Sequence, residues 1–468
     1  TLLNHPIQVH PEPRIGFAWQ PLSSGDLVLR GGYGIYANRT SFEGNGSLMA
    51  LNPPFALNAV LIGAANATAS LVSPFPSLPA SSSFPNFVGT MLPGPPFTGN
   101  RFLRSPLITS PDFKESTVQQ YGFDLQYQHK SYVFSIGYAG AKGTHLAVGR
   151  SNNQPPLASP STPLNGLTTN SVANAAERVP FVGLSPLLYR LESSGNSIYN
   201  SLQATLKKDM SHGFQFLAAY TFSKSIDDAG DSLGAAIAGT FGLPITGQVV
   251  YNDQNNVAAQ RGLSDFERTH RLVISGTWNV PGPEHAISAA VRKLGDGWSI
   301  SGIATLQSGR PFSILDSGAG TLFGPATIYT TGSLAPGTTL ADAGRSGSVS
   351  SRVNEFFNTS AFASAPLVPD GSLIDGKYPV SGGGTIFGNL GRNILRGPDQ
   401  RDFDIAVIKI TPLTEHVNVI FRWEIFNMLN RTNFANPSND VSTPSTFGVI
   451  SALTVNPRIM QYALKLEF

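Results

Sequence analysis

The charged residues whose spacing suggests a shared function lie near the C-terminal end of the sequence. Arg422 and Glu424 are two positions apart in a stretch of alternating character, and Asp404 belongs to a similar stretch before them. Residues two apart in a β-strand point to the same side, so we expect these charges to share one face. Such a set can contact a polar ligand or a protein segment, but its spacing favours a salt-bridge ladder within a sheet. Asp124 and Arg271 occupy the polar side of two further alternating stretches.

Catalytic and metal-binding patterns are not found in the sequence. The eight histidines show neither HExxH nor a paired spacing, and the chain has no cysteine, so no metal site is predicted. The stretch GDS at 230–232 lacks the G-x-S-x-G surroundings of a nucleophilic serine. The glycine-rich stretch SGGGTIFGNLGRN at 381–393 lacks the GK[ST] ending of a phosphate-binding loop. We therefore predict no enzyme, no cofactor and no metal, and an irregular loop at 381–393.

The composition of the 468 residues favours strands and loops. Lys and Arg number 31 against 29 Asp and Glu, so the net charge of +2 gives no indication of nucleic-acid binding. Charged residues make up 13% of the chain, where roughly 25% is usual for soluble domains. Glycine (48) and proline (35) are abundant. No apolar run reaches the roughly 20 residues that a membrane helix needs.

Many stretches alternate between an apolar and a more polar side. The middle of each apolar side carries no charged residue, whereas the opposite sides carry charges. Each stretch has about the 9–11 residues of a tilted membrane strand, and about eleven of them are predicted to be strands. They are RIGFAWQ, LVLRGGYGIY, STVQQYGFDLQYQ, SYVFSIGYAG, SIYNSLQATLKK, GFQFLAAYTFSKS, RLVISGTWNV, GWSISGIATLQ, DFDIAVIK, HVNVIFRWEIFN and RIMQYALKLEF.

The connections between these stretches alternate between short and long. The short ones lie at 21–26, 129–130, 209–213 and 411–416, with a medium one at 281–297 that has room for a short helix. The long ones lie at 38–115, 143–196, 226–266, 310–399 and 429–456. Alternation alone also suits a soluble sandwich, but loops beyond about 15 residues are uncommon in compact soluble domains. The rhythm therefore predicts an all-β fold, a transmembrane antiparallel β-barrel with short periplasmic turns and long extracellular loops.

The last stretch ends on an aromatic residue. Tyr462, Leu464, Leu466 and Phe468 share its apolar side, and a final alternating strand that ends in Phe is what the barrel assembly machinery of bacterial outer membranes recognises. We expect these four residues to be a C-terminal assembly signal. Bacterial single-chain barrels have an even number of strands. Eleven strands are therefore interpreted as half of a 22-stranded barrel, the size of plugged outer-membrane transporters, whose other strands precede Thr1.

Several segments resemble a known family. YNSLQATLKK, AYTFSKSIDD, RGLSDFERTHRLVISGTWNVP, GWSISGIATLQSGRPFSI, FGNLGRNILRGPDQRDFDIAVIK, FRWEIFNMLNRTNF and FGVISALTVNPRIMQYALKLEF are together similar to the barrel of TonB-dependent outer-membrane receptors. The most similar group is the Oar-like one common in Acidobacteria. The resemblance implies that 1–468 is the C-terminal portion of such a barrel in the bacterial cell outer membrane, with the plug and N-terminal regulatory-like domains absent. It also implies transport of a bulky substrate, powered by TonB–ExbB–ExbD through the missing N-terminal region.

The partners expected from this hypothesis are outer-membrane lipid, the barrel assembly machinery, the TonB–ExbB–ExbD complex and an unknown substrate, with no nucleic acid. Asp124, Arg271, Asp404, Arg422 and Glu424 are then lumen-facing candidates for contact with the substrate or the plug. Two alternatives remain open. One is a passive porin or an adhesion or surface-binding barrel that uses its long loops. The other is a soluble secreted β-protein.

Overall fold

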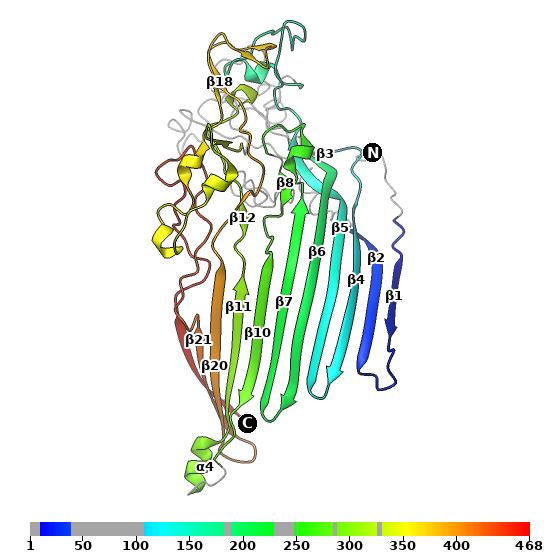
Figure 1. The fold of residues 1–468 in the computed structure, drawn as a ribbon, viewed down its shortest axis with the longest axis vertical. Helices are drawn as coiled ribbons and strands as arrows, with labels where there is room; N and C mark the ends of the chain where they lie inside the picture. Colours follow the sequence, from blue (N-terminus) through cyan, green and yellow to red (C-terminus); the bar gives the residue numbers. More distant parts are fainter. Residues whose placement is uncertain are drawn as a thin grey trace, which may run out of the picture.

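The computed structural model describes residues 10–38, 107–181, 189–228, 248–249, 251–283, 288–324 and 330–468. Eleven strands form one antiparallel sheet in which each strand pairs with the next of the series (Figure 1), as the sequence predicts. In order they are β1 (Arg14–Trp19), β2 (Leu27–Asn38), β4 (Ser116–His129), β5 (Tyr132–Ser151), β6 (Tyr189–Ser211), β7 (Phe214–Asp227), β10 (His270–Asn279), β11 (Trp298–Gln307), β20 (Gln400–Pro412), β21 (Asn418–Phe426) and β22 (Ile459–Glu467).

Short connections lie at one end of the sheet and long ones at the other, as predicted. The β6–β7 turn places His212 and Gly213 at φ 52° and 72°, the positive values that a type I′ hairpin requires at both central positions. The medium connection between β10 and β11 contains the helix α4 (Ala289–Gly295), whose N-terminus is capped by the Ser288 side chain. Figure 1 shows α4 at the turn end, far from the long connections. We call the two ends the turn rim and the loop rim.

Strands β5 and β6 are longer than the sequence predicts. Their pairing continues past two irregularities, between Gly143 and Leu146 and between Leu146 and Val148, and His145 has a φ of 56°. The expected loop at 143–196 therefore narrows to about 152–188. The prediction ended these strands early because a bulge shifts the two-residue alternation. Three short strands extend the sheet here: β3 (Leu107–Thr109) on β6, β8 (Gln248–Val249) on β5 and β9 (Gly262–Leu263) on β7.

The long connections fold into a loop body at the loop rim, which we define as the described residues of 152–181, 251–267, 308–399 and 430–456. Four small ribbons lie in it: β12 (Pro311–Phe312) with β19 (Leu395–Arg396), β13 (Ser333–Leu334) with β14 (Phe362–Ala363), β15 (Leu367–Val368) with β18 (Gly384–Thr385), and β16 (Leu373–Ile374) with β17 (Tyr378–Pro379). Its single-turn helices are η2 (Ala175–Glu177), η3 (Val257–Gln260), η4 (Thr321–Phe323), η5 (Leu340–Ala343), η6 (Ser350–Arg352) and η7 (Thr359–Ala361).

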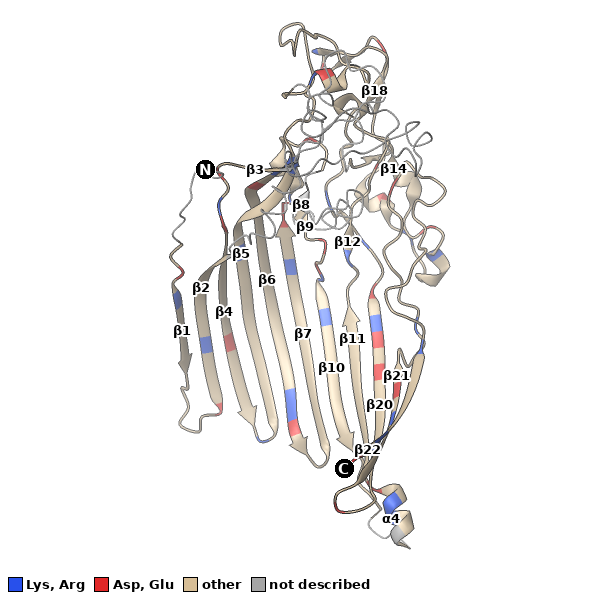
Figure 2. Ribbon diagram, turned by 180° about the vertical axis from the view of Figure 1, so that it is seen from behind, with Lys and Arg blue, Asp and Glu red and all other residues tan. Residues whose placement is uncertain are grey.

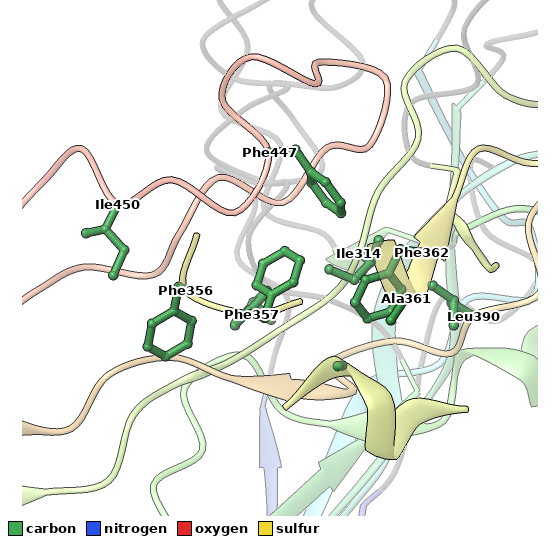
Figure 3. Close-up of a cluster of buried hydrophobic side chains, with 10 residues drawn as sticks. Ile314, Phe356, Phe357, Ala361, Phe362, Leu390, Phe447 and Ile450 are labelled. Carbon is green, nitrogen blue, oxygen red and sulfur yellow. The ribbon is translucent and has the colours of Figure 1, made fainter. Parts of the chain in front are cut away.

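The hydrophobic core of the described chain lies in this loop body (Figure 3). Phe357 packs edge-on against Phe362 and Phe447, with ring centroids 5.6 and 5.1 Å apart. Ile314 and Ala361 are fully buried beside these rings. Aromatic rings in this arrangement stabilise a core beyond the area they bury. The long connections are therefore a packed unit of their own.

The apolar side of the sheet, in contrast, is not covered by protein in the described chain. Ile274 in its middle is 40% exposed, Trp278 near the turn rim is 43% exposed, and Leu464 on β22 is 74% exposed. A soluble sandwich would cover this face with a second layer. An extended uncovered apolar surface of this kind instead marks contact with membrane or protein. The described structure thus has its hydrophobic core in the loop body at one end, and the apolar face of the sheet is not covered by other protein segments.

Candidate functional site

The five lumen-facing candidates all lie on one face of the sheet, which we call the polar face. Away from the irregularities near His145 and at the β6–β7 turn, the cross-strand register is regular, so residues paired across adjacent strands lie on the same face of the sheet. On that face lie Asp124, Arg271, Asp404, Arg422 and Glu424, whose register positions alternate with those of the apolar face. The structure thus places them on a shared surface, but in three separate positions along it.

Three of the candidates come together on β20 and β21. Arg422 Nη2 donates to Glu424 Oε1 over 2.7 Å. Glu424 pairs across the strands with Ala406, which places Asp404 diagonally beside it. Asp404 Oδ1 in turn accepts a hydrogen bond from the Asn427 backbone N–H at 2.8 Å. The cluster carries one net negative charge, and the Arg422 side chain is about half exposed, so it remains open to a ligand.

The fourth candidate, Asp124, lies on β4 beside a hollow of about 1020 Å³ over β1 to β6. Its carboxylate is 3.7 Å from Arg30 Nη1 on β2. Gly16, Gly32 and Gly122 are direct cross-strand neighbours in the floor of this hollow. Because none of them has a side chain, the floor there is bare backbone and another chain segment can approach closely.

Arg271, the fifth candidate, lies near the loop rim of β10. No side-chain partner of Arg271 is found in the described part of the chain, and the side chain is exposed. Burial lowers the pKa of the neighbouring Arg268, and the charges of Arg310 and Arg271 lower it further. Three arginines therefore lie within electrostatic reach of one another where the polar face meets the loop body.

A second hollow, of about 470 Å³, lies on the polar face between β7 and β21. Leu217, Ile303 and Phe426 are exposed there by 41%, 48% and 42%, next to Asp404 and Glu424. Apolar side chains bordered by carboxylates form an amphipathic surface, which suits a ligand or a protein segment of mixed polarity.

The loop body is fastened to the sheet by a buried arginine. Arg392 pairs with Asp227 at the end of β7, and their side chains are 1% and 5% exposed. Arg392 Nε donates to the Gln260 carbonyl at 3.1 Å, and Asp265 Oδ1 lies 3.6 Å from Nη1. A buried charge pair of this kind is costly to break because one charge would be left without compensation.

A second buried arginine joins two parts of the loop body. The guanidinium of Arg178 donates to the Asn174 side chain at 2.9 Å and to the carbonyls of Pro156 and Leu322. Burial lowers the pKa of Arg178 to about 10. Sequence reasoning missed both arginines. Arg392 lies in the glycine-rich stretch at 381–393, where only its charge among apolar and glycine residues distinguishes it, and its partner is 165 residues away.

The residues expected to form the assembly signal lie on β22. Tyr462, Leu464 and Leu466 pair with positions 423, 421 and 419 of β21 on the apolar face. The rings of Trp423 and Tyr462 stack, with centroids 5.9 Å apart. Phe468 follows the end of the strand and is 95% exposed. Their role in assembly remains a prediction.

On the described strands, the charged residues of the apolar face lie near the rims, and Figure 2 shows blue segments near the loop-rim ends of β7 and β10. Toward the loop rim the bordering polar residues are Lys142 on β5, Lys224 on β7, His270 on β10 and Arg401 on β20. The cross-strand pairs connect each of these residues, strand by strand, to a position on β7. In the same order, the β7 positions at the same height are 226, 224, 222 and 220. From β5 to β20 the border thus descends six residues over five strand steps.

The border toward the turn rim descends in the same direction. Lys208 on β6 is level with Phe216 of β7, and Lys409 on β20 lies four residues lower after four strand steps. With ~3.4 Å per residue and ~4.8 Å between strands, steps of about 1.0 to 1.2 residues correspond to a tilt of roughly 35–40°. Membrane barrel strands are tilted by about 35–45°. The two borders therefore run parallel to each other across the tilted strands, as the two surfaces of a membrane would.

The band between the borders has the height of a membrane core. On β20 it runs from Arg401 to Lys409, which are eight positions apart, or ~27 Å along the strand. At the tilt above, this corresponds to ~21 Å along the membrane normal, close to the ~25 Å apolar band of outer-membrane barrels. No described helix is long and apolar enough to cross a membrane. Nor do three His, Asp or Glu side chains gather as metal ligands in the described ranges.

The family described as outer membrane beta barrel domain matches residues 3–461. Among solved structures, the chain is similar to the outer membrane transporter YddB from Escherichia coli, with a TM-score of 0.45 and 9% identity over 97% of this chain and 40% of that one. It is also similar to BauA, the ferric preacinetobactin receptor from Acinetobacter baumannii (TM-score 0.39, 9% identity, 98% and 36% covered). A third is the ferric citrate transporter FecA in its unliganded form (TM-score 0.39, 8% identity, 98% and 38% covered). The chain thus spans two fifths or less of these solved chains. None of the curated proteins compared with it matches.

Proposed function

The chain belongs to the outer membrane beta barrel domain family and lies in the bacterial outer membrane, and from this premise we propose that it transports a bulky substrate as part of the barrel of a TonB-dependent receptor. The observation that carries the proposal is the loop body, packed around its own core and fastened to the sheet by the buried Arg392–Asp227 pair. A passive pore needs an unobstructed mouth. An ordered body at the loop rim instead suits capture of a particular substrate before passage.

The polar face supports the same function. It becomes the lumen wall when the apolar face meets lipid, and it then offers Asp124, Arg271, Asp404, Arg422 and Glu424 to the lumen. The bare glycine floor near Asp124 and the amphipathic hollow near Glu424 leave room of about 1020 and 470 Å³. We propose that these surfaces receive the substrate or a plug domain.

The eleven strands are proposed to be one part of a larger closed wall. In the described chain β1 and β22 each have a single neighbour in the sheet, and unpaired backbone groups cost several kcal/mol each in hydrocarbon. Direct pairing of β1 with β22 would not restore the pattern, because the first and last of eleven antiparallel strands run in the same direction. An odd number of further strands would close the sheet with every strand paired antiparallel on both sides. Eleven more would give the 22 strands of plugged outer-membrane transporters.

The TonB-dependent and Oar-like assignments rest on the sequence resemblance. The segments that carry it include β6, β7, β10, β20, β21 and β22, together with the loop that contains Arg392. The proposal extends to the corresponding partners: the barrel assembly machinery acting on the β22 side chains Tyr462 to Phe468, and TonB–ExbB–ExbD acting through an N-terminal region.

The test compares energised with passive passage. The protein, produced as its gene encodes it, is placed in a host outer membrane, and uptake of candidate substrates is measured with ExbB–ExbD present and deleted. The proposal expects uptake to stop when ExbB–ExbD is absent and single-channel conductance in a planar bilayer to be negligible. Steady conductance with uptake independent of ExbB–ExbD would establish the porin alternative. Binding of a ligand at the loops without any uptake would establish the adhesion alternative.

A further inference from the structure

The cations at the two rims of the apolar face differ in their bonding. At the turn rim, Lys208 Nζ donates to the Ser211 carbonyl (3.0 Å), the Ser211 hydroxyl (2.7 Å) and the Phe214 carbonyl (2.7 Å). Lys409 Nζ donates to the carbonyls of Lys293 (2.8 Å) and Asp296 (2.7 Å). Both ammonium groups thus hold turns or the α4 connection in place, and their donors are used within the protein.

Among the described residues, the cations at the loop rim have no such bonds. Within the described ranges, the side chains of Lys142, Lys224 and Arg401 make no hydrogen bond or ion pair, and those of Lys224 and Arg401 are exposed. On the polar face, Arg30 and Arg422 each have a carboxylate partner, whereas Arg271 has none among the described residues. Unpaired positive charge on the apolar side therefore gathers at the level where the membrane surface meets the loop rim.

Two of these cations lie close together on strands that flank β6. Lys142 on β5 and Lys224 on β7 are separated by β6 and offset by two residues, so their Cα atoms are ~12 Å apart. Asn200 of β6 lies between them, level with Lys224. The Asn200 Oδ1 accepts from the Tyr138 hydroxyl at 2.5 Å, and its NH₂ group has no hydrogen-bond partner among the described residues.

The surface directly below this group is apolar. Leu202 on β6 and Phe222 on β7 are the next positions toward the middle of the band, and they are 44% and 46% exposed. Flexible lysine stems above exposed apolar side chains match an amphiphile that carries anionic groups at its head and acyl chains below. A free anion would gain nothing from the apolar part of this surface.

We propose that Lys142, Asn200 and Lys224 form a binding site for the phosphate groups of a lipid in the outer leaflet. The two ammonium groups are spaced to hold a head group with two phosphates or to converge on one phosphate, while the Asn200 amide donates a further hydrogen bond. The acyl chains lie against Leu202 and Phe222. Arg401 and His270 continue the same rim around the sheet at the same membrane depth.

The test titrates the purified full-length protein in a nonionic detergent with diphosphoryl lipid A and counts bound lipid by native mass spectrometry. A surface lysine contributes about fivefold to attraction by anionic lipid, so Lys142→Gln and Lys224→Gln should each weaken binding about fivefold and together about thirtyfold. Lys207→Gln is the control, because it removes a lysine charge from the polar face of β6, where Lys207 pairs with Asp209 over 2.7 Å. The Lys142→Arg/Lys224→Arg variant should retain the lipid. Heat-modifiable mobility in SDS verifies that each variant folds.

Four outcomes would overturn the site. Unchanged binding in the folded double Gln variant would show that these lysines do not hold the lipid, and so would an equal loss in Lys207→Gln. Loss of binding in the folded double Arg variant would contradict recognition by charge. Phosphatidylcholine or inorganic phosphate binding as tightly as lipid A would contradict a site for anionic lipid.

Discussion

The strongest test of the membrane geometry is a pair of adjacent substitutions on β10. Ile274 faces the apolar side and lies four residues from both His270 and Trp278, which stand at the two borders of the band on this strand. It is therefore in the middle of the hydrocarbon. Ser275 is the next residue and points to the polar face, where it lines the hollow of about 470 Å³.

Arginine at these two positions should have very different costs. At the membrane midplane of a barrel, a lipid-facing Arg destabilises by about 2–4 kcal/mol, so Ile274→Arg should lower the folded-to-unfolded ratio by about 30-fold to 1000-fold. Ser275→Arg places the same charge in a water-accessible hollow beside Asp404 and Glu424, and its cost should stay below ~1 kcal/mol. Ile274→Ala separates loss of the side chain from burial of a charge.

The measurement is equilibrium unfolding in guanidinium of the full-length protein in phospholipid vesicles, followed by tryptophan fluorescence. The expected order of stability is Ser275→Arg close to the unmodified protein and Ile274→Arg well below both it and Ile274→Ala. If Ser275→Arg proved as damaging as Ile274→Arg, or if both were harmless, the assignment of the apolar face to lipid would be refuted.

Three further outcomes are expected in the loop body. Arg392→Gln should leave Asp227 buried without a counter-charge and destabilise the attachment of the loop body by about 3–5 kcal/mol, seen as faster hydrogen exchange at 381–393 with β7 unchanged; equal protection would contradict the fastening role. Gly388→Ala should destabilise the loop because its Cβ would meet the carbonyls of residues 331 and 332, whereas the matched Gly391→Ala, with its nearest atom at 3.6 Å, should leave the melting temperature unchanged. Bonding to Arg345 lowers the pKa of Glu355 below its ordinary 4.5, so the stability it contributes is present above pH 4.5 and lost as the pH falls through the lowered pKa; hydrogen exchange around η7 should rise on acidification, and Glu355→Gln should remove that dependence.

Much of the sheet was predictable because the environment of each face of a strand is reflected in the residue types at alternating positions of that strand. Alternation with a two-residue period places Ile274 and Ser275 on opposite faces whatever their partners are. The same period, with the short and long connections, predicted the eleven strands and the shared face of Asp404, Arg422 and Glu424. It failed where a bulge near His145 shifts the alternation, so that β5 and β6 continue beyond the predicted ends, and it missed the short strands β3, β8 and β9.

The arrangement within the candidate site was less accessible. That Arg422 pairs with Glu424 follows from their spacing, but the hollow beside them depends on which residues of β7 and β11 the register brings alongside. The isolated position of Arg271 likewise emerges only once β10 is placed between β7 and β11 and its neighbours are known.

The sequence by itself determined the strands, their two faces and the rim at which the long connections gather. Each of these features depends on the pattern of residues that are a few positions apart in the chain. Only the tertiary structure decided how those connections pack, which buried arginine fastens them and which rim lysines have no bonding partner in the described part of the chain. Irregular loops have no period from which contacts can be read. Their core and the Arg392–Asp227 pair form between segments far apart in the chain, where only the complete fold determines which groups meet.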